Sequence, residues 1–166
     1  MDPGFRASLD RLLVMNTLLP VGEPLSPHYY EWRSLVRKTP DLPVGKVIRA
    51  ITPDLTNREM AAYDAPYPDT RFKAGVRAFP ELAMVNPRME GVAESEAAIR
   101  FWKEEWSGPS FMAVGAKDPD PQIMLTLRSQ IRGCPQPLVV ANAGHFVPEW
   151  GEPVARAALH AFGDLS

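Results

Sequence analysis

The 166-residue sequence predicts an α/β fold in which a long helical segment interrupts a parallel sheet. Three short apolar runs have the continuous pattern of parallel strands that are covered on both faces. An amphipathic helix is expected after the second run and another after the third, which is the alternation of right-handed strand–helix–strand crossovers. No convincing strand lies between the first run and the second, so a helical cap is expected there.

The expected strands span Leu12–Met15, Phe111–Val114 and Leu138–Ala141. Apolar residues at helical spacing predict helices over Pro121–Arg132 and Glu152–Phe162. Gly133 follows the first of these helices, at the position where glycine commonly ends a helix. The first strand starts only about ten residues into the chain. The sheet is therefore expected to be part of a larger doubly wound domain.

Residues 20–107 are the expected cap, and residues 1–19 and 108–166 are the expected partial core. Thr56 is a plausible signal for the start of a helix within the cap. An insertion between two parallel strands would cover their carboxyl ends, where open α/β sheets bind ligands. The cap helices are expected over Tyr29–Lys38, Val44–Ala50, Asn57–Tyr63, Lys73–Arg77 and Glu94–Trp106.

Composition argues against several function classes. A net charge of -2 gives no electrostatic reason to expect nucleic acid binding, and no apolar run is long enough for a membrane helix. The polar segment Met1–Arg6 does not resemble a secretory signal, so a cytoplasmic protein is expected. The single cysteine, Cys134, leaves no internal disulfide and is expected to be structural. Without metal-ligand spacing among the histidines, or any phosphate-binding glycine motif, neither metal nor cofactor is expected.

Two titratable side chains follow neighbouring strands. His145 comes just after the third strand, where a histidine can serve as a general base, although a lone loop histidine is more often structural. Asp118 comes just after the second strand and could orient that histidine, although Asp-Pro is also a common turn pair. An acid followed by a histidine, each just past a strand, is the C-terminal order of α/β-hydrolase triads, which favours catalysis.

No nucleophile elbow of the Gly-x-Ser-x-Gly kind occurs in the sequence. The chain is therefore expected to contain the base and its acid but not the nucleophile.

Three segments of the sequence closely resemble the haloalkane dehalogenases of the α/β-hydrolase superfamily. They are Arg11–Thr17, the cap motifs Tyr63–Asp69, Phe72–Arg77 and Phe79–Pro80, and the run Trp106–Asp118. Arg132–Pro135 and Ala143–Val147 extend the resemblance over nearly the whole chain. The resemblance implies the C-terminal part of an α/β-hydrolase fold, with parallel strands and flanking helices, plus an inserted α-helical cap.

The resemblance also implies a reaction in two stages. A carboxylate displaces halide to form an alkyl-enzyme ester, and water activated by a histidine hydrolyses that ester. By motif position His145 resembles the base, Asp118 its acidic partner, and Trp32 the cap tryptophan whose indole N–H binds halide. Asn16 resembles a residue near the histidine. Pocket-lining positions are expected at Tyr29, Phe79 and Pro80.

Halogenated alkane, water and halide are the implied ligands once the fold is complete. The family's nucleophilic aspartate would lie upstream of the first strand, so the isolated chain is expected to be inactive and to self-associate through its open sheet edge. The loop at residues 118–121 is shorter than the family usually shows, which makes Asp120 a competitor for the acid role. An epoxide hydrolase acting through cap tyrosines, and a truncated module that only binds a partner, are the alternatives.

Overall fold

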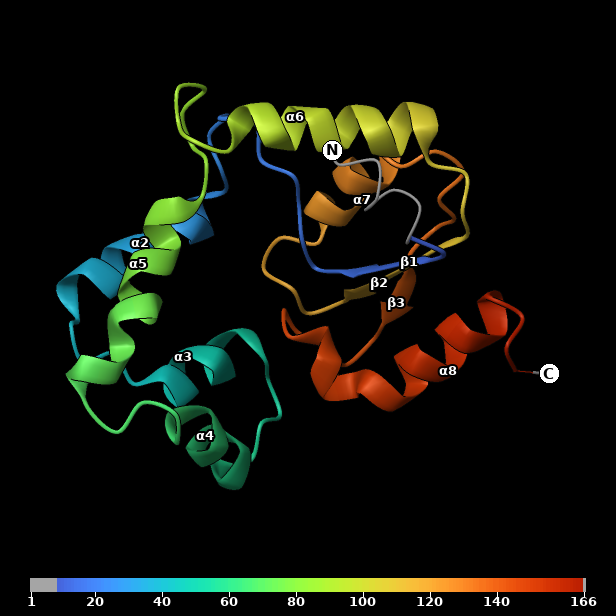
Figure 1. Ribbon diagram of the computed structural model, residues 1–166. Coiled ribbons are helices and arrows are strands. Elements are labelled where there is room, and N and C mark those ends of the chain that lie inside the picture. Colours follow the sequence, from blue (N-terminus) through green and yellow to red (C-terminus); the bar gives the residue numbers. More distant parts are fainter. Residues whose placement is uncertain (1–8, 166) are drawn as a thin grey trace.

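The computed structural model describes residues 9–165 of the chain. The polar segment Met1–Arg6, from which the sequence argued against a secretory signal, lies outside the described residues. Figure 1 shows a small sheet with helices against it and a separate group of helices to one side. Within residues 9–165 no helix is both long and apolar enough to cross a membrane.

The sheet has three parallel strands in the order β1-β2-β3: β1 (Leu12–Met15), β2 (Ser110–Gly115) and β3 (Leu138–Val140). Leu13 pairs with Phe111, and Val114 pairs with Val139. The three predicted strands are therefore confirmed to within one residue at each end. Because all three run in the same direction, their carboxyl ends meet at one edge of the sheet.

The prediction that all three strands are buried is wrong for β1 and β3. Only β2, the central strand, is buried along nearly its whole length. In β3, Leu138 is 36% exposed and Val139 is 62% exposed. Both outer strands leave one edge without a neighbour among the described residues, so their apolar runs lack the cover that a central strand receives.

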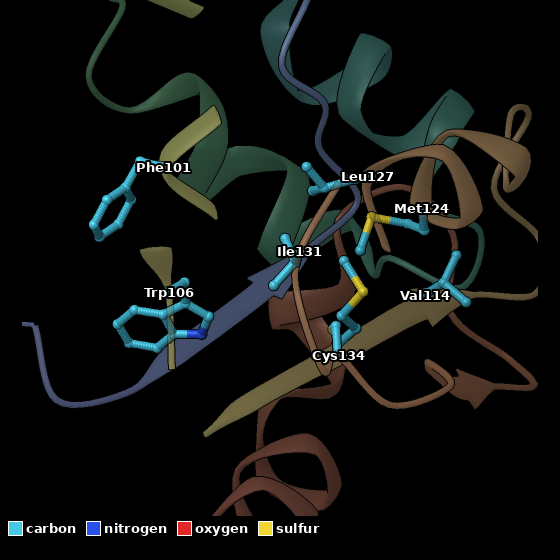
Figure 2. Packing of buried hydrophobic residues seen from close by; sticks show 8 residues of the cluster. Phe101, Trp106, Val114, Met124, Leu127, Ile131 and Cys134 are labelled. Atoms are coloured by element: carbon cyan, nitrogen blue, oxygen red, sulfur yellow. The ribbon is translucent and has the colours of Figure 1, made fainter. Parts of the chain in front are cut away.

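Helices cover both faces of the sheet. Helix α7 (Gln122–Ser129) contributes Met124 and Leu127 to a buried cluster with Met112 and Val114 of β2. Cys134 lies in the same cluster, as expected of a structural cysteine, and Figure 2 shows it close to the sheet. A turn, η3 (Val147–Trp150), and helix α8 (Gly151–Ala161) pack on the other face through Val147, Val154 and Ala158.

Helices α2 to α5 lie beyond the edge at which β1 and β2 end, whereas α6 runs along the core on the side of α7 (Figure 1). Helices α3 and α4 pack against one another, as do α2 and α5. Thr56 begins α4 with a reciprocal capping box to Glu59, as the sequence predicted. The elements are α2 (Pro27–Lys38), α3 (Val44–Ile51), α4 (Asn57–Asp64), η1 (Thr70–Lys73), α5 (Ala74–Leu82), α6 (Val92–Arg100) and η2 (Phe101–Glu105).

Helix α5 is longer than the sequence predicted, because it continues through Pro80 to Leu82. A proline disfavours helical conformation in the residue before it, yet Pro80 lies inside this helix. In the last turn, the hydroxyl of Tyr29 donates to the main-chain carbonyl of Pro80. That contact satisfies a carbonyl oxygen at the helix end that would otherwise lack an intrahelical donor.

The end of the cap segment returns to the core. After α6 the chain widens into a single π-helical stretch, η2, closed by Trp106 N donating to Phe101 O at 2.9 Å. Phe101 and Trp106 are buried with Met112 of β2, and Trp102 packs against them. Trp106 is thus a core residue, and Trp102 is a partly buried residue at the margin of the core. The cap boundary at residue 107 stays a prediction, since these side chains pack with the sheet.

Candidate functional site

Asn16, Asp118 and His145 come together where the three strands end. Asn16 directly follows β1, Asp118 lies three residues beyond β2, and His145 lies five residues beyond β3. His145 Nδ1 is 2.8 Å from Asp118 Oδ2. These three residues are 27 to 129 positions apart in the sequence, and the parallel register brings them together at one edge of the sheet.

The Asp118 carboxylate has acceptor contacts at both oxygens. Its side chain is only 1% exposed. Oδ2 accepts from the Asn16 amide and faces the His145 ring, and Oδ1 accepts from the Asp120 main-chain N–H at 2.6 Å. Burying a carboxylate is costly unless such partners are present. A carboxylate only accepts hydrogen bonds, so in this contact the His145 ring donates through Nδ1, and in a neutral ring the acceptor lone pair is then on Nε2.

Asp120 contributes to the site through its main chain. Its N–H donates to Asp118, and no side-chain hydrogen bond from Asp120 reaches His145 in the described part of the chain. Of the two aspartates that the sequence left open for the acid role, Asp118 is therefore the one whose carboxylate contacts the histidine ring.

The amide of Asn16 ties the three strand ends together. Its Nδ2 donates to the main-chain oxygens of His145 at 2.9 Å and Gly144 at 3.3 Å, as well as to Asp118. Its Oδ1 accepts from Gly115 N at 3.4 Å. Asn16 adopts a left-handed backbone with φ of 37°, a conformation that asparagine tolerates better than most residues. In this conformation the Asn16 side chain contacts the segment after β2 and the segment after β3.

The segment 143–147, here called the histidine loop, packs closely on its surroundings. A Cβ at Gly115 would lie 2.1 Å from Gly144 O, so only glycine permits the approach of β2 to this loop. A Cβ at Gly144 would lie 2.3 Å from Ile51 O, at the end of α3. On the cap side, His145 N donates to the same Ile51 oxygen at 2.7 Å. The loop is thus enclosed between the sheet and the cap.

A second group of expected site residues gathers between α2 and α5. The rings of Tyr29 and Trp32 are 6.0 Å apart, and those of Trp32 and Phe79 are 6.1 Å apart. Pro80 is fully buried, whereas Phe79 is 66% exposed. The Trp32 indole N–H donates no hydrogen bond to any residue in the range 9–165, so this donor is available to a ligand.

An ion-pair network holds α2 against α5 beside those aromatic rings. Arg33 Nη2 lies 2.5 Å from Glu81 Oε2, and Arg37 Nε lies 2.6 Å from Glu81 Oε1. Hydrogen bonds from Arg37 and Arg33 lower the pKa of Glu81 to about 2. Burial raises the pKa of the Tyr29 hydroxyl. Trp32 and Phe79 are therefore set on two helices that are fixed to one another.

The structure does not join the two groups by direct contact. No hydrogen bond, ion pair or ring contact links Trp32, Tyr29, Phe79 or Pro80 to Asp118 or His145 within the described residues. The described chain also contains no group of three or more histidine, cysteine, aspartate or glutamate side chains that could hold a metal.

Sequence reasoning missed the side chains that connect the cap to the histidine loop. Tyr63 of α4 donates through its hydroxyl to the Glu149 carboxylate of η3, 86 positions away. Its ring packs on Phe146, with centroids 6.0 Å apart. The sequence showed Tyr63 only as part of a cap motif, and no spacing signal pairs it with Glu149.

Comparisons with known proteins point to one family. No protein-family model matches the chain. Haloalkane dehalogenase from Mycolicibacterium paratuberculosis is 34% identical over 145 residues, covering 84% of this chain and 47% of that protein. Haloalkane dehalogenase from Psychrobacter cryohalolentis is 29% identical over 161 residues, covering 93% of this chain and 52% of that protein. The chain thus spans about half the length of these curated relatives.

The structural comparison agrees. The structure of haloalkane dehalogenase DpaA from Paraglaciecola agarilytica, described as tetrameric, superposes with a TM-score of 0.90 at 37% identity. The superposition covers 96% of this chain and 54% of that one. DbeA from Bradyrhizobium elkani superposes with a TM-score of 0.72 at 16% identity and supports the fold alone.

Proposed function

We propose that this chain, a homologue of the haloalkane dehalogenases over about half of their length, supplies the base, acid and cap of a hydrolase that cleaves carbon–halogen bonds. The observation that supports the proposal most is the contact of His145 Nδ1 with Asp118 Oδ2 at 2.8 Å, at the carboxyl ends of parallel strands. The homology supplies the reaction class, because the pair by itself would suit many hydrolases.

In the proposed mechanism, His145 acts in the second stage. The contact of Nδ1 with Asp118 leaves Nε2 free to accept a proton from water, and the resulting hydroxide attacks the carbonyl carbon of an alkyl-enzyme ester. Asp118 stabilises the imidazolium that forms. The tetrahedral intermediate collapses to a free carboxylate and an alcohol, which takes the remaining proton of the attacking hydroxide, and His145 releases the proton that it accepted to solvent water.

Trp32 is proposed to act in the first stage. As the carbon–halogen bond breaks, negative charge develops on the leaving halogen, and a free indole N–H can donate to it. Tyr29, Phe79 and Pro80 would form an apolar wall beside the halide, because they share the α2–α5 contact with Trp32. Water excluded from such a wall makes the single donor more effective.

The first displacement requires a carboxylate nucleophile. Among the described residues, Asp118 is the one carboxylate that contacts the His145 ring, and its oxygens are already engaged. We therefore propose that this chain releases no halide until a segment with the nucleophile completes the fold. Cytoplasmic location and the absence of nucleic acid partners remain part of the proposal.

Two alternatives are less well supported. An epoxide hydrolase would need cap tyrosine hydroxyls free to donate to an epoxide oxygen. The hydroxyls of Tyr29 and Tyr63 are instead bound to Pro80 O and the Glu149 carboxylate. That leaves Tyr30 and Tyr67, whose hydroxyls make no hydrogen bond within the described residues, as the donors on which this alternative would depend. A module that only binds a partner would not need Asp118 to be held by both His145 and Asn16.

Self-association is proposed at the β3 edge, one of the two sheet edges that have no neighbour among the described residues. Val139 is the most exposed residue of β3, and the sequence between Arg132 and Glu149 holds no lysine, arginine, aspartate or glutamate to discourage pairing at that edge. The tetrameric description of DpaA belongs to that relative and supports the proposal only indirectly.

The test follows halide release from 1-bromobutane and 1,2-dichloroethane. The chain alone is expected to release none, whereas the chain combined with the N-terminal half of the Mycolicibacterium paratuberculosis relative is expected to turn over. In that complex His145→Gln should give a single burst of halide and accumulate alkyl-enzyme. Turnover by the chain alone, or continued turnover by His145→Gln, would contradict the proposal.

A further inference from the structure

We propose that Tyr63 and Glu149 are positioning residues that latch the cap onto the histidine loop and so hold the His145 ring against Asp118. The latch is defined as the hydroxyl of Tyr63, the carboxylate of Glu149 that accepts from it, and the ring of Phe146 that packs on the Tyr63 ring. His145 enters here as the base of the proposed function, but the latch is argued from contacts alone.

The first line of evidence is a chain of side-chain contacts from the cap to the base. The Tyr63 hydroxyl donates to Glu149 Oε1, so α4 is bonded to η3. The Tyr63 ring meets the Phe146 ring edge-on at 6.0 Å and 88°. The Phe146 ring in turn meets the His145 ring at 5.8 Å and 61°. Tyr63 therefore contacts the chain on both sides of residue 147.

The second line of evidence is the main chain. Ile51, the last residue of α3, accepts the His145 N–H at 2.7 Å. Helices α3 and α4 pack against one another, so Ile51 and Tyr63 belong to one pair of packed helices (Figure 1). The cap holds the loop at His145 through α3 and at Phe146 and Glu149 through α4. Two attachment points fix an orientation, whereas one would act as a pivot.

The third line of evidence is how little else restrains the imidazole. The only hydrogen bond that its ring makes with the described residues is the one to Asp118, and 35% of the side chain is exposed. A ring held at one nitrogen can still tilt about that bond, and small displacements of a catalytic group are costly to the rate. The Phe146 ring closes the side toward the cap, and Tyr63 keeps Phe146 in place.

The Tyr63 hydroxyl stays protonated near neutral pH. Burial and the hydrogen bond to Glu149 raise the pKa of Tyr63 to about 12, so the hydroxyl remains a donor. A carboxylate is a stronger acceptor than a neutral group, which favours this pair over a bond to water.

The experiment uses the full chain labelled with ¹⁵N and records the main-chain N–H exchange rate and the ring Nδ1–H signal of His145. Tyr63→Phe removes one hydroxyl and keeps the ring. It should raise His145 N–H exchange about tenfold, as expected for losing one hydrogen bond to a charged acceptor, and broaden the Nδ1–H signal. Tyr67→Phe is the matched control, because the Tyr67 hydroxyl makes no hydrogen bond among residues 9–165, and it should change neither readout.

Glu149→Ala provides a second route to the same test. It should reproduce the effect of Tyr63→Phe, and the double variant should add little, because both substitutions break one interaction. Unchanged His145 signals in both single variants, or fully additive effects, would overturn the latch. If the variants had a lower melting temperature but unchanged His145 signals, the latch would also be overturned, because Tyr63 and Glu149 would then stabilise the fold without positioning His145. These readouts need no halide release, so failure of the proposed activity would not be mistaken for failure of the latch.

Discussion

The side-chain amide of Asn16 donates to the main-chain oxygen of His145 at 2.9 Å, across 129 positions of sequence. The same amide nitrogen donates to the Asp118 oxygen that faces the His145 ring. Asn16 thus touches the histidine loop and the acid at once. The residue that ends the first strand thereby contacts the loops that follow the other two strands.

Asn16→Ala should destabilise the chain and loosen the histidine. The substitution leaves the Asp118 carboxylate and the Gly144 and His145 carbonyls short of a donor, which costs about 1–3 kcal/mol. Urea unfolding measures the loss. Asn142→Ala is the control, since Asn142 is exposed and makes no side-chain hydrogen bond within the described residues. Equal midpoints for the two variants would show that Asn16 is dispensable.

Asp118→Asn should impair ester hydrolysis in the completed enzyme by at least about a hundredfold, because a neutral amide cannot stabilise the imidazolium. Asp120→Asn should have little effect, since Asp120 contributes only its main-chain N–H to the site. Single-turnover kinetics on preformed alkyl-enzyme separates this step from halide displacement. A larger loss in Asp120→Asn would reassign the acid.

Trp32→Phe should slow halide displacement roughly a hundredfold, the usual cost of removing one donor to developing charge. Phenylalanine keeps the ring contacts with Tyr29 and Phe79 but has no N–H. The rate of the halide burst in the completed enzyme measures the step. Trp150→Phe, outside the cap, serves as control. An unchanged burst in Trp32→Phe would remove Trp32 from the proposed halide site.

Acid should release α2 from α5. The folded pKa of Glu81, about 2, lies below its ordinary value of 4.5, so its bonds to Arg37 and Arg33 stabilise the fold above pH 4.5. That contribution is lost as the pH falls from about 4.5 toward 2. Tryptophan fluorescence during acid titration reports it through Trp32. Glu81→Gln should flatten the transition, and Glu90→Gln should not; identical titrations would contradict the prediction.

Val139→Lys should weaken self-association by placing a charge on the open sheet edge. Sedimentation velocity over a range of chain concentrations measures the effect. Leu125→Lys on α7 is the matched control, because Leu125 is also an exposed apolar residue but lies away from that edge. If both variants associate as the unmodified chain does, the β3 edge is not the contact surface.

The order of strands and helices could be predicted from the sequence because its signals are local. Apolar runs and the helix start at Thr56 act within a few residues of where they stand. The glycine signal was less exact, because α7 ends at Ser129 and not at Arg132, the residue before Gly133. The meeting of His145 and Asp118 could also be anticipated, because each closely follows a strand and parallel strands end at one edge.

Only the tertiary structure decided the relationships that depend on packing between distant segments. No spacing rule connects Tyr63 to Glu149, or Asn16 to the main chain of His145, because both contacts depend on how the cap and strand ends are oriented in space. The exposure of β3 was mispredicted for the same reason. An apolar run indicates that a strand would gain from burial. Whether the strand is buried depends on the segments that fold against it.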